Sequence, residues 1–373
     1  MANTSRVSDP RIAIVHDYVT QIGGAERVVL SLLRAFPNSR LVTALYDPEH
    51  SFPEFRDVEV ETLSINRMSG LRTDARRAFP LLAPAFSQHT VRGADILICS
   101  SSGWAHGIGG PQPKIVYCHN TARWLYQPAD YLAGLPHSAR VATQMLGPAL
   151  RAWDRRAARR AHTYVGNSRA VVARISQAYG LDALLLPPPV VLDRSGPRTP
   201  VSGLEPGFLL VVSRGRGYKN VSIVEDAVER LLPNQRLIVV GSETVTGSTS
   251  SRVRALGTVS DAQLRWLYSS CGAVVSVARE DFGLTPLEAN EFGKPTIVLR
   301  YGGYLDTTIE GVSGVFVEEA TAEAVADAIR RVPATEPKVL HAHARRFSQE
   351  RFAATMQQIV GEVHDPSRKA PEG

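Results

Sequence analysis

The sequence predicts an α/β protein with two domains, each built around a parallel sheet. Short apolar runs rich in valine and isoleucine, which are typical of buried strands, alternate with segments whose apolar residues recur at helical spacing. The length of 373 residues is sufficient for two separate hydrophobic cores. A stretch rich in Pro, Ser and Gly at 187–206 predicts the linker between them. We therefore expect a first domain over residues 11–190, a second over 205–345, and a disordered polar tail over 365–373.

The first predicted strand, residues 11–17, leads into a helix that begins directly behind Gly23 and Gly24. One face of this helix should pack on the sheet, since its apolar residues lie at helical spacing: Val28, Val29, Leu32, Leu33 and Phe36. The two glycines let a ligand approach the unpaired N–H groups at the helix start, and a tight structural turn is the alternative. A Gly-x-Gly-x-x-Gly motif is absent here, which argues against a nicotinamide dehydrogenase.

A histidine follows one of the remaining strands of the first domain. Further strands are predicted at 41–45, 58–63, 94–100 and 114–118, and helices at 137–162 and 168–179. His119 directly follows the strand 114–118, at the carboxyl end where open α/β sheets bind their ligands. Taken alone, His119 is more simply interpreted as a structural histidine.

A basic loop follows the first strand of the second domain. The apolar run 208–212 precedes Arg214, Arg216 and Lys219, with glycines between them. Arg214 or Lys219 alone is consistent with an ordinary surface charge, but together, behind a buried strand, these two favour contact with phosphate, and Arg216 is assigned no role. Asn220 occupies the position of the third glycine of a dinucleotide-binding motif, so that motif is absent here too.

The stretch 280–288 predicts an anion-binding site at the start of a helix. A valine-rich strand over 272–278 precedes it, and the Thr-Pro-Leu-Glu segment ending at Glu288 fits an N-cap, a first-turn proline and a capping-box glutamate. A strand, a glycine-containing turn and a helix N-terminus present unpaired N–H groups to a phosphate. Glu280 and Glu288 are suited instead to accept hydrogen bonds from sugar hydroxyls. These residues predict a sugar-nucleotide site; a helix cap and a solvated loop acid are the alternatives.

Composition and charge narrow the classes of partner and compartment. The three cysteines lie in or beside apolar runs, which predicts buried thiols in a reducing compartment. No apolar run approaches the roughly 20 residues that span a bilayer, and the N-terminal residues lack the apolar core of a signal peptide, so we expect a cytoplasmic protein. The net charge of +6 comes partly from the arginine-rich segment 151–160, interpreted first as a solvated helix face. Peripheral contact with the anionic inner face of the membrane is the second interpretation. We expect no nucleic-acid partner, since no nucleic-acid-binding signature accompanies the charge.

Together these segments resemble the retaining glycosyltransferases of family 4. Glu280 and Glu288 form that family's Glu-x7-Glu motif with the usual Phe-Gly between them, and the Gly-Lys-Pro-Thr-Ile-Val and Gly-Gly-Tyr-Leu-Asp segments continue the likeness. The opening His-Asp-Tyr…Gly-Gly-Ala-Glu-Arg and the segment 117–126, Tyr-Cys-His-Asn-Thr-Ala-Arg-Trp-Leu-Tyr, are similar to a branch that includes bacterial mannosyltransferases. The segment 117–126 lacks the proline that is common in that branch.

The resemblance implies the GT-B architecture, in which two Rossmann-like parallel-sheet domains face a cleft and a last helix, here 346–363, crosses back to the first domain. It also implies two catalytic residues: His119 at the transferred sugar and Glu280 on the hydroxyls of that sugar. The implied donor-binding residues are Gly23, Gly24, Arg214, Lys219, Val259, Phe282, Gly283, Leu284, Thr285 and Glu288. Arg123 and Tyr126 are expected to contact the acceptor.

The implied activity is transfer of a hexose, with retention, from a nucleotide-diphosphate sugar to a hydroxyl acceptor, and the nearest branch favours GDP-mannose. The acceptor is left open between a glycan, a lipid-linked sugar and a small natural product. No Asp-x-Asp occurs, so we expect neither a metal nor another cofactor; Arg214, Lys219 and the helix N-terminus would stabilise the leaving diphosphate. The alternative is a catalytically silent GT-B protein that binds a nucleotide sugar or a partner as a regulator.

Overall fold

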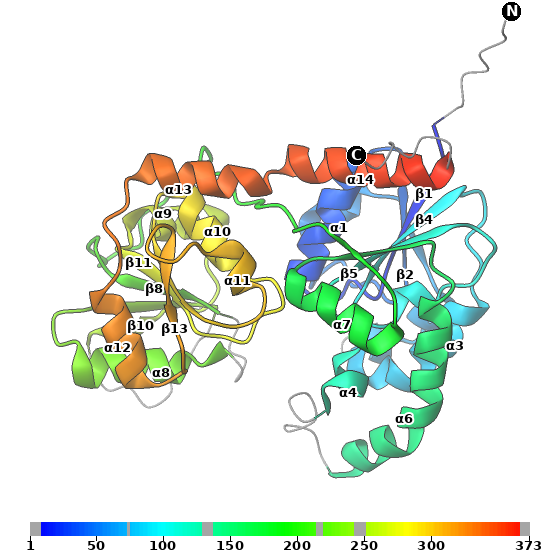
Figure 1. Cartoon of the computed structure of the whole chain (residues 1–373), viewed down its shortest axis with the longest axis horizontal. Helices are drawn as coiled ribbons and strands as arrows, with labels where there is room; N and C mark the ends of the chain where they lie inside the picture. Colours follow the sequence, from blue (N-terminus) through cyan, green and yellow to red (C-terminus); the bar gives the residue numbers. More distant parts are fainter. Residues whose placement is uncertain (1–8, 73–74, 129–136, 214–218, 242–250, 366–373) are drawn as a thin grey trace, which may run out of the picture. The chain divides into compact units, whose positions relative to one another are not determined.

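The computed structural model describes residues 9–72, 75–128, 137–213, 219–241 and 251–365 of the chain (Figure 1). Contacts divide the chain into two compact units: the first comprises Met1–Pro187 with Phe352–Gly373, and the second comprises Pro188–Arg351. Arg214, and all of the predicted tail except Asp365, lie outside the described residues.

The first unit is built on a parallel sheet whose order, within the described ranges, is β3-β2-β1-β4-β5-β6-β7. Its strands are β1 (Ile12–His16), β2 (Arg40–Thr43), β3 (Val60–Thr62), β4 (Ile96–Ser101), β5 (Lys114–Cys118), β6 (Thr163–Gly166) and β7 (Leu184–Leu185). The register places His16 opposite Ser100, and Ser100 opposite Tyr117. The carboxyl ends of β1, β4 and β5 therefore lie side by side at one edge of the sheet.

Helices cover both faces of this sheet. They are α1 (Gly24–Ala35), α2 (Ser69–Arg72), α3 (Phe79–Gln88), α4 (Arg123–Tyr126), α6 (His137–Ala158), α7 (Arg169–Tyr179) and α14 (Gln349–His364). Successive residues of β4 alternate between two cores: Ile96 and Ile98 pack with α1 and α14, whereas Leu97 and Cys99 pack with α3 and α7. This alternation explains why the strand is apolar along its whole length, as expected for a parallel sheet covered on both sides.

Helix α14 is the last described helix in the sequence, yet it belongs to the core of the first unit. Phe352 and Met356 are buried among residues of α1 and the sheet. The Nε2 of Gln357 donates to the carbonyl of Ala35 at the end of α1, at 2.9 Å. The first unit is therefore completed by residues that lie on the far side of the second unit in the sequence.

The second unit has a smaller parallel sheet, with the order β10-β9-β8-β11-β12-β13 among the residues that the structure describes. Its strands are β8 (Leu209–Val212), β9 (Leu237–Val240), β10 (Val253–Ala255), β11 (Ala273–Ser276), β12 (Thr296–Leu299) and β13 (Gly314–Val317). Its helices are α8 (Val221–Asp226), α9 (Asp261–Ser270), α10 (Leu284–Glu291), α11 (Tyr304–Thr307), α12 (Ala322–Arg330) and α13 (Pro337–Ala344). Helices α8 and α12 pack on one face of the sheet, and α9 and α10 pack on the other.

The structure corrects the predicted start of α10. The helix begins at Leu284 and its N-cap is Gly283, with φ 81° and ψ 84°, so Thr285 lies inside the first turn and the predicted capping box is wrong. Glycine adopts this left-handed conformation without the clash that a Cβ would cause, and it starts the helix before the proline. Pro286 is still tolerated, because N–H groups in the first turn have no intrahelical acceptor.

Candidate active site

Three side chains from adjacent strands of the first unit form a hydrogen-bonded chain. The Nδ1 of His16, at the end of β1, lies 2.9 Å from the carbonyl oxygen of Ser100 and 3.1 Å from its Oγ. The same Oγ lies 2.7 Å from the Nε2 of His119, which follows β5. His16 and Ser100 are buried, whereas His119 is half-buried. The predicted catalytic histidine, His119, is thus hydrogen-bonded to Ser100, which is hydrogen-bonded in turn to His16. We did not predict either partner, although both lie at the carboxyl ends of neighbouring strands.

His119 carries no charge at physiological pH. Burial of its imidazole and, as a smaller cause, the neighbouring His16 together lower the pKa of His119 to about 3. A neutral imidazole has one N–H donor and one acceptor nitrogen. His119 can therefore take part in a neutral hydrogen bond to a hydroxyl, but it does not offer an imidazolium to a phosphate.

The two predicted glycines at the start of α1 differ in the space that is available for a side chain. A Cβ at Gly23 would overlap the carboxylate of Glu26, whereas a Cβ at Gly24 would meet nothing within 4 Å. Glu26 is buried, and its Oε1 accepts a hydrogen bond of 3.0 Å from the Nε2 of Gln21. Gly23 thus makes room for a carboxylate of its own chain, and Gly24 is the one with open space beside it.

The residues assigned to the acceptor lie on the short helix α4. The hydroxyl of Tyr126 donates to Oδ2 of Asp154 at 2.8 Å, and burial together with this carboxylate raises the pKa of Tyr126. Asp154 is fully buried, and its Oδ1 lies 3.1 Å from the Nε2 of His106. Arg123 is half-buried at the start of the same helix. The structure ties Tyr126 to the interior, and contact of either residue with an acceptor stays a prediction.

In the second unit, Lys219 and Glu280 are brought together. The Nζ of Lys219 makes an ion pair with Oε1 of Glu280, and each side chain keeps about a fifth of its surface exposed (19% and 21%). The sequence assigned these residues to different parts of the donor, the diphosphate and the sugar. Arg214, the other predicted phosphate ligand, lies outside the described residues.

The loop between Glu280 and α10 is held by direct backbone packing. The N–H of Gly303 donates to the carbonyl of Glu280 at 3.2 Å. A Cβ at Gly302 would overlap that same carbonyl, and a Cβ at Gly303 would overlap the backbone of Phe282. The ring of Tyr304 occupies the place of a Cβ at Gly283. The Gly-Gly-Tyr segment is therefore the support on which the predicted donor loop rests.

Glu288 faces the interior rather than the start of its own helix. Its Oε2 accepts a hydrogen bond of 2.7 Å from the hydroxyl of Tyr268, and the residue is 7% exposed. Tyr268, on α9, stacks on Phe292 with ring centroids 5.4 Å apart. Val259, in the turn before α9, is half-buried against the same core. Glu288 is thus a fixed acceptor, and its tyrosine partner was not predicted.

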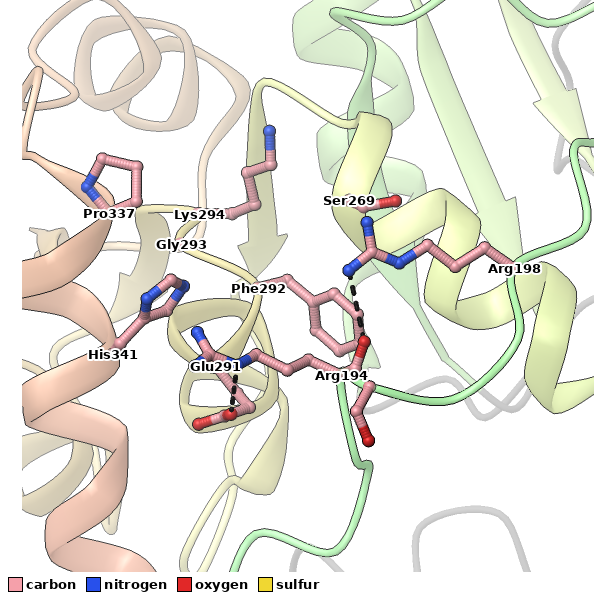
Figure 2. A pocket seen from close by; sticks show the side chains of 10 residues that line it. Arg194, Arg198, Ser269, Glu291, Phe292, Gly293, Lys294, Pro337 and His341 are labelled. Carbon is pink, nitrogen blue, oxygen red and sulfur yellow. Dashed lines mark hydrogen bonds and ion pairs between the residues drawn. The ribbon is translucent and has the colours of Figure 1, made fainter.

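A cavity of about 450 Å³ lies elsewhere in the second unit (Figure 2). Its lining residues are Arg194, Ser195, Arg198, Ser269, Glu291, Phe292, Gly293, Lys294, Pro337 and His341. Arg194 pairs with Glu291 at 3.4 Å, and the guanidinium of Arg198 lies 5.8 Å from the ring centroid of Phe292 (Figure 2). This cavity lies at the C-terminal end of α10, whereas the loop from Glu280 to Gly283 leads into the N-terminus of that helix.

The described residues include neither a metal-binding cluster nor a membrane-spanning helix. Within the described ranges, no group of three or more His, Cys, Asp and Glu side chains is placed to hold a metal ion. No helix in the same ranges is both long and apolar enough to cross a membrane. The three cysteines are buried and free, and burial raises the pKa of Cys99 and Cys271 to about 12.

Two protein families match adjoining parts of the chain. Residues 22–194 match Glycosyltransferase Family 4, and residues 199–350 match Glycosyl transferases group 1. Each of the two units contains a Rossmann-like parallel sheet, as in solved GT-B glycosyltransferases. The chain therefore has the GT-B fold, and its first part is similar to family 4 and its second part to group 1.

Individual proteins that resemble this chain have low sequence identity to it. A D-inositol 3-phosphate glycosyltransferase of Geodermatophilus obscurus is 31% identical over an alignment of 223 residues, and the match covers 50% of this chain and 49% of that protein. The chain thus spans about half the length of this curated relative. The structure of sucrose-phosphate synthase from Thermosynechococcus elongatus matches with a TM-score of 0.72 at 19% identity, covering 95% of this chain and 99% of that one. HepE of Anabaena, solved in complex with UDP-glucose, matches with a TM-score of 0.67 at 16% identity, covering 94% and 99%.

Proposed function

We propose that the chain is a retaining glycosyltransferase that moves a hexose from a nucleotide-diphosphate sugar to a hydroxyl acceptor. The observation that carries this proposal is the loop from Glu280 to Gly283, which leads into the N-terminus of α10 and has the ammonium of Lys219 beside it. A helix start and a fixed cation are features that bind phosphate groups. They lie in the part of the chain that matches Glycosyl transferases group 1.

Donor binding would exchange one partner of Lys219 for another. A partly exposed ion pair such as Lys219–Glu280 is worth about 0–1 kcal/mol, because water solvates both charges well. A charged hydrogen bond to phosphate is worth about 1.5–3 kcal/mol, so the diphosphate competes successfully for the ammonium. Glu280 is then released to accept hydrogen bonds from the sugar hydroxyls.

The remaining assignments concern the ends of the donor. Glu288 would accept the ribose hydroxyls while it keeps its bond to Tyr268, and the turn at Val259 would meet the base. His119 would hydrogen-bond to the transferred sugar. The segment 117–126 favours GDP-mannose, whereas HepE was solved with UDP-glucose, so both donors need to be compared.

We also propose that the protein is cytoplasmic and that its activity needs no metal. Basic residues of α6 would make peripheral contact with an anionic membrane surface. The acceptor is a hydroxyl compound, either a glycan, a lipid-linked sugar or a small natural product. Arg155 and Arg156 lie in the last turn of α6, Arg159 lies just after it, and all three are exposed.

The test is direct binding and turnover with defined donors. Calorimetry should detect GDP-mannose or UDP-glucose and the matching free diphosphate, and NMR should detect slow donor hydrolysis with release of the α-configured sugar first. Binding of neither donor would refute the proposal. Binding without hydrolysis, and without transfer to any of a panel of hydroxyl acceptors, would identify a silent binding protein instead.

A further inference from the structure

We propose that Ser100 is a positioning residue, which together with His16 fixes His119 in the tautomer that carries its hydrogen on Nδ1. The N–H at Nδ1 then serves as a donor to a hydroxyl of the bound sugar. Only this last step rests on the proposed function, since the tautomer is a property of the protein alone.

The chain of hydrogen bonds starts at a backbone carbonyl. The carbonyl oxygen of Ser100 lies 2.9 Å from Nδ1 of His16, and a carbonyl can only accept. Nδ1 of His16 must therefore carry a hydrogen. His16 is 2% exposed, so water does not compete effectively for this bond.

The second hydrogen bond of this N–H is donated by His16 to the hydroxyl of Ser100. Oγ of Ser100 lies 3.1 Å from the same N–H, and it accepts from that N–H because the ring nitrogen there has no lone pair to offer. A hydroxyl has one hydrogen to donate. Since Ser100 is fully buried, this hydrogen is directed to the remaining neighbour, Nε2 of His119 at 2.7 Å.

The tautomer of His119 follows from this direction. Nε2 accepts, and burial keeps the ring neutral by lowering the pKa of His119 to about 3, so the single ring hydrogen lies on Nδ1. No residue within the described ranges provides a hydrogen-bond partner for Nδ1. His119 is half-buried, and its backbone carbonyl is held by Nδ2 of Asn167 at 3.1 Å. The ring is thus anchored on one side and keeps a donor on the other.

A neutral donor is suited to a hydroxyl rather than to a proton transfer. A histidine fixed in this way donates one hydrogen bond to the transferred sugar and removes no proton from the acceptor. Without the hydroxyl of Ser100, nothing in the described part of the chain determines which ring nitrogen of His119 carries the hydrogen.

The first test reads the tautomer without substrate. In ¹⁵N-edited NMR of the full chain at pH 7, with His119→Gln used for assignment, His119 should show a protonated Nδ1 and an unprotonated Nε2. A protonated Nε2 in the unmodified protein overturns the proposal without the need for any variant. In Ser100→Ala the signals should shift toward a mixture of tautomers, and unchanged signals would also overturn it.

Ser101→Ala is the matched control. Ser101 is the next residue of β4, it is also buried, and its Oγ contacts Asp17 and His106 rather than His119. Its removal should leave the ¹⁵N shifts of His119 unchanged.

The second test is kinetic and uses the proposed activity. Ser100→Ala should lower kcat about two- to tenfold, the value of one neutral hydrogen bond, and leave the KM for the donor nearly unchanged. An unchanged kcat would overturn the positioning role. If the chain binds no donor at all, the proposed function fails, and the NMR result still decides the tautomer.

Discussion

At the scale of single residues, the candidate site depends on charged groups that are paired before any ligand arrives. Lys219 is paired with Glu280, and Glu288 accepts from Tyr268. These pairs neutralise or fix groups that would otherwise be costly to hold beside an apolar core. Each pair can be tested separately, because one partner can be replaced while the other is kept.

Replacing Lys219 with alanine should weaken both the donor and the free nucleoside diphosphate. The lost charged hydrogen bond is worth about 1.5–3 kcal/mol, or roughly tenfold to over a hundredfold in Kd, measured by calorimetry. Lys294→Ala is the matched control, since Lys294 lines the cavity at the opposite end of α10 (Figure 2). Equal diphosphate affinity in the Lys219 variant and its control would remove Lys219 from the site.

Replacing Glu280 with glutamine should instead retain nucleotide affinity and lose transfer.

Replacing Glu288 with glutamine should weaken nucleotide binding without a large change in Tm. A glutamine still accepts from Tyr268 through its one carbonyl oxygen, but it loses the charge and one acceptor that two ribose hydroxyls require. Calorimetry and a melting curve on the same sample check both parts. Tyr268→Phe is the control for stability: it keeps the stacked ring but removes the hydrogen bond that the buried carboxylate accepts, at a cost of about 1–3 kcal/mol. Normal nucleotide binding by the glutamine variant would contradict the ribose assignment.

His119 should make the protein less stable as the pH falls. In the unfolded chain a histidine takes up a proton near pH 6.5, whereas the pKa of His119 in the folded protein is about 3. Between these values the unfolded state binds one more proton, so the free energy of unfolding falls as the pH falls, by at most about 1.4 kcal/mol per pH unit. Urea unfolding at pH 7.5, 6 and 5 should show a larger loss for the unmodified protein than for His119→Gln. Parallel losses would show that His119 ionises normally.

At the scale of elements, the helix start at Gly283 shows how local signals and packing compete. The Thr-Pro-Leu-Glu segment matches a capping box, but Gly283 and the ring of Tyr304 beneath it start the helix earlier. The local pattern contains no information about Tyr304, which is contributed by a later element. Backbone packing of this kind can be tested with glycine variants.

Gly302→Ala should disturb the donor loop more than Gly311→Ala. Both glycines have φ in the left-handed region, 58° and 71°, so both variants carry a strain of about 1–2 kcal/mol. Only at Gly302 would the added Cβ also overlap the carbonyl of Glu280, whereas Gly311 has nothing within 4 Å. We expect a lower Tm for Gly302→Ala than for Gly311→Ala, together with weaker nucleotide binding. Equal effects on both properties would mean that the loop is not held by this contact.

The strands were predictable because parallel strands covered on both faces are continuous apolar runs. Strand β5 was predicted over the residues it occupies, and the helix predicted from 168 is α7, whose N-cap Ser168 accepts from the N–H of Val171 at 3.2 Å. Long-range pairs could not be predicted in this way. Lys219 and Glu280 lie 61 positions apart, and Ser100 and His119 meet only because β4 and β5 are neighbours.

At the scale of the whole molecule, the chain consists of two units that each have their own cores, and the fold is shared with GT-B structures over almost its entire length. Fold alone does not specify the reaction, because one fold hosts many chemistries. The choice of donor, the acceptor and the need for a metal must therefore be measured.

Transfer activity should be unaffected by a chelator. In the proposed site the ammonium of Lys219 and the N-terminus of α10 stabilise the charge of the diphosphate, which a metal ion does in other transferases. Activity after treatment with EDTA, compared with a sample to which magnesium or manganese is returned, provides the measurement. A loss that is restored by the added ion would contradict the metal-free proposal.

The place of α14 in the first unit has a consequence for how the protein is made. A ribosome completes residues 12–187 well before it adds the helix that covers one face of their sheet. During the synthesis of the whole second unit, the apolar side chains of α1 and the sheet that later contact Phe352 and Met356 have no cover from their own chain. The nascent polypeptide therefore carries an unfinished, aggregation-prone surface until α14 leaves the exit tunnel, and this interval is when a chaperone would be most useful to it.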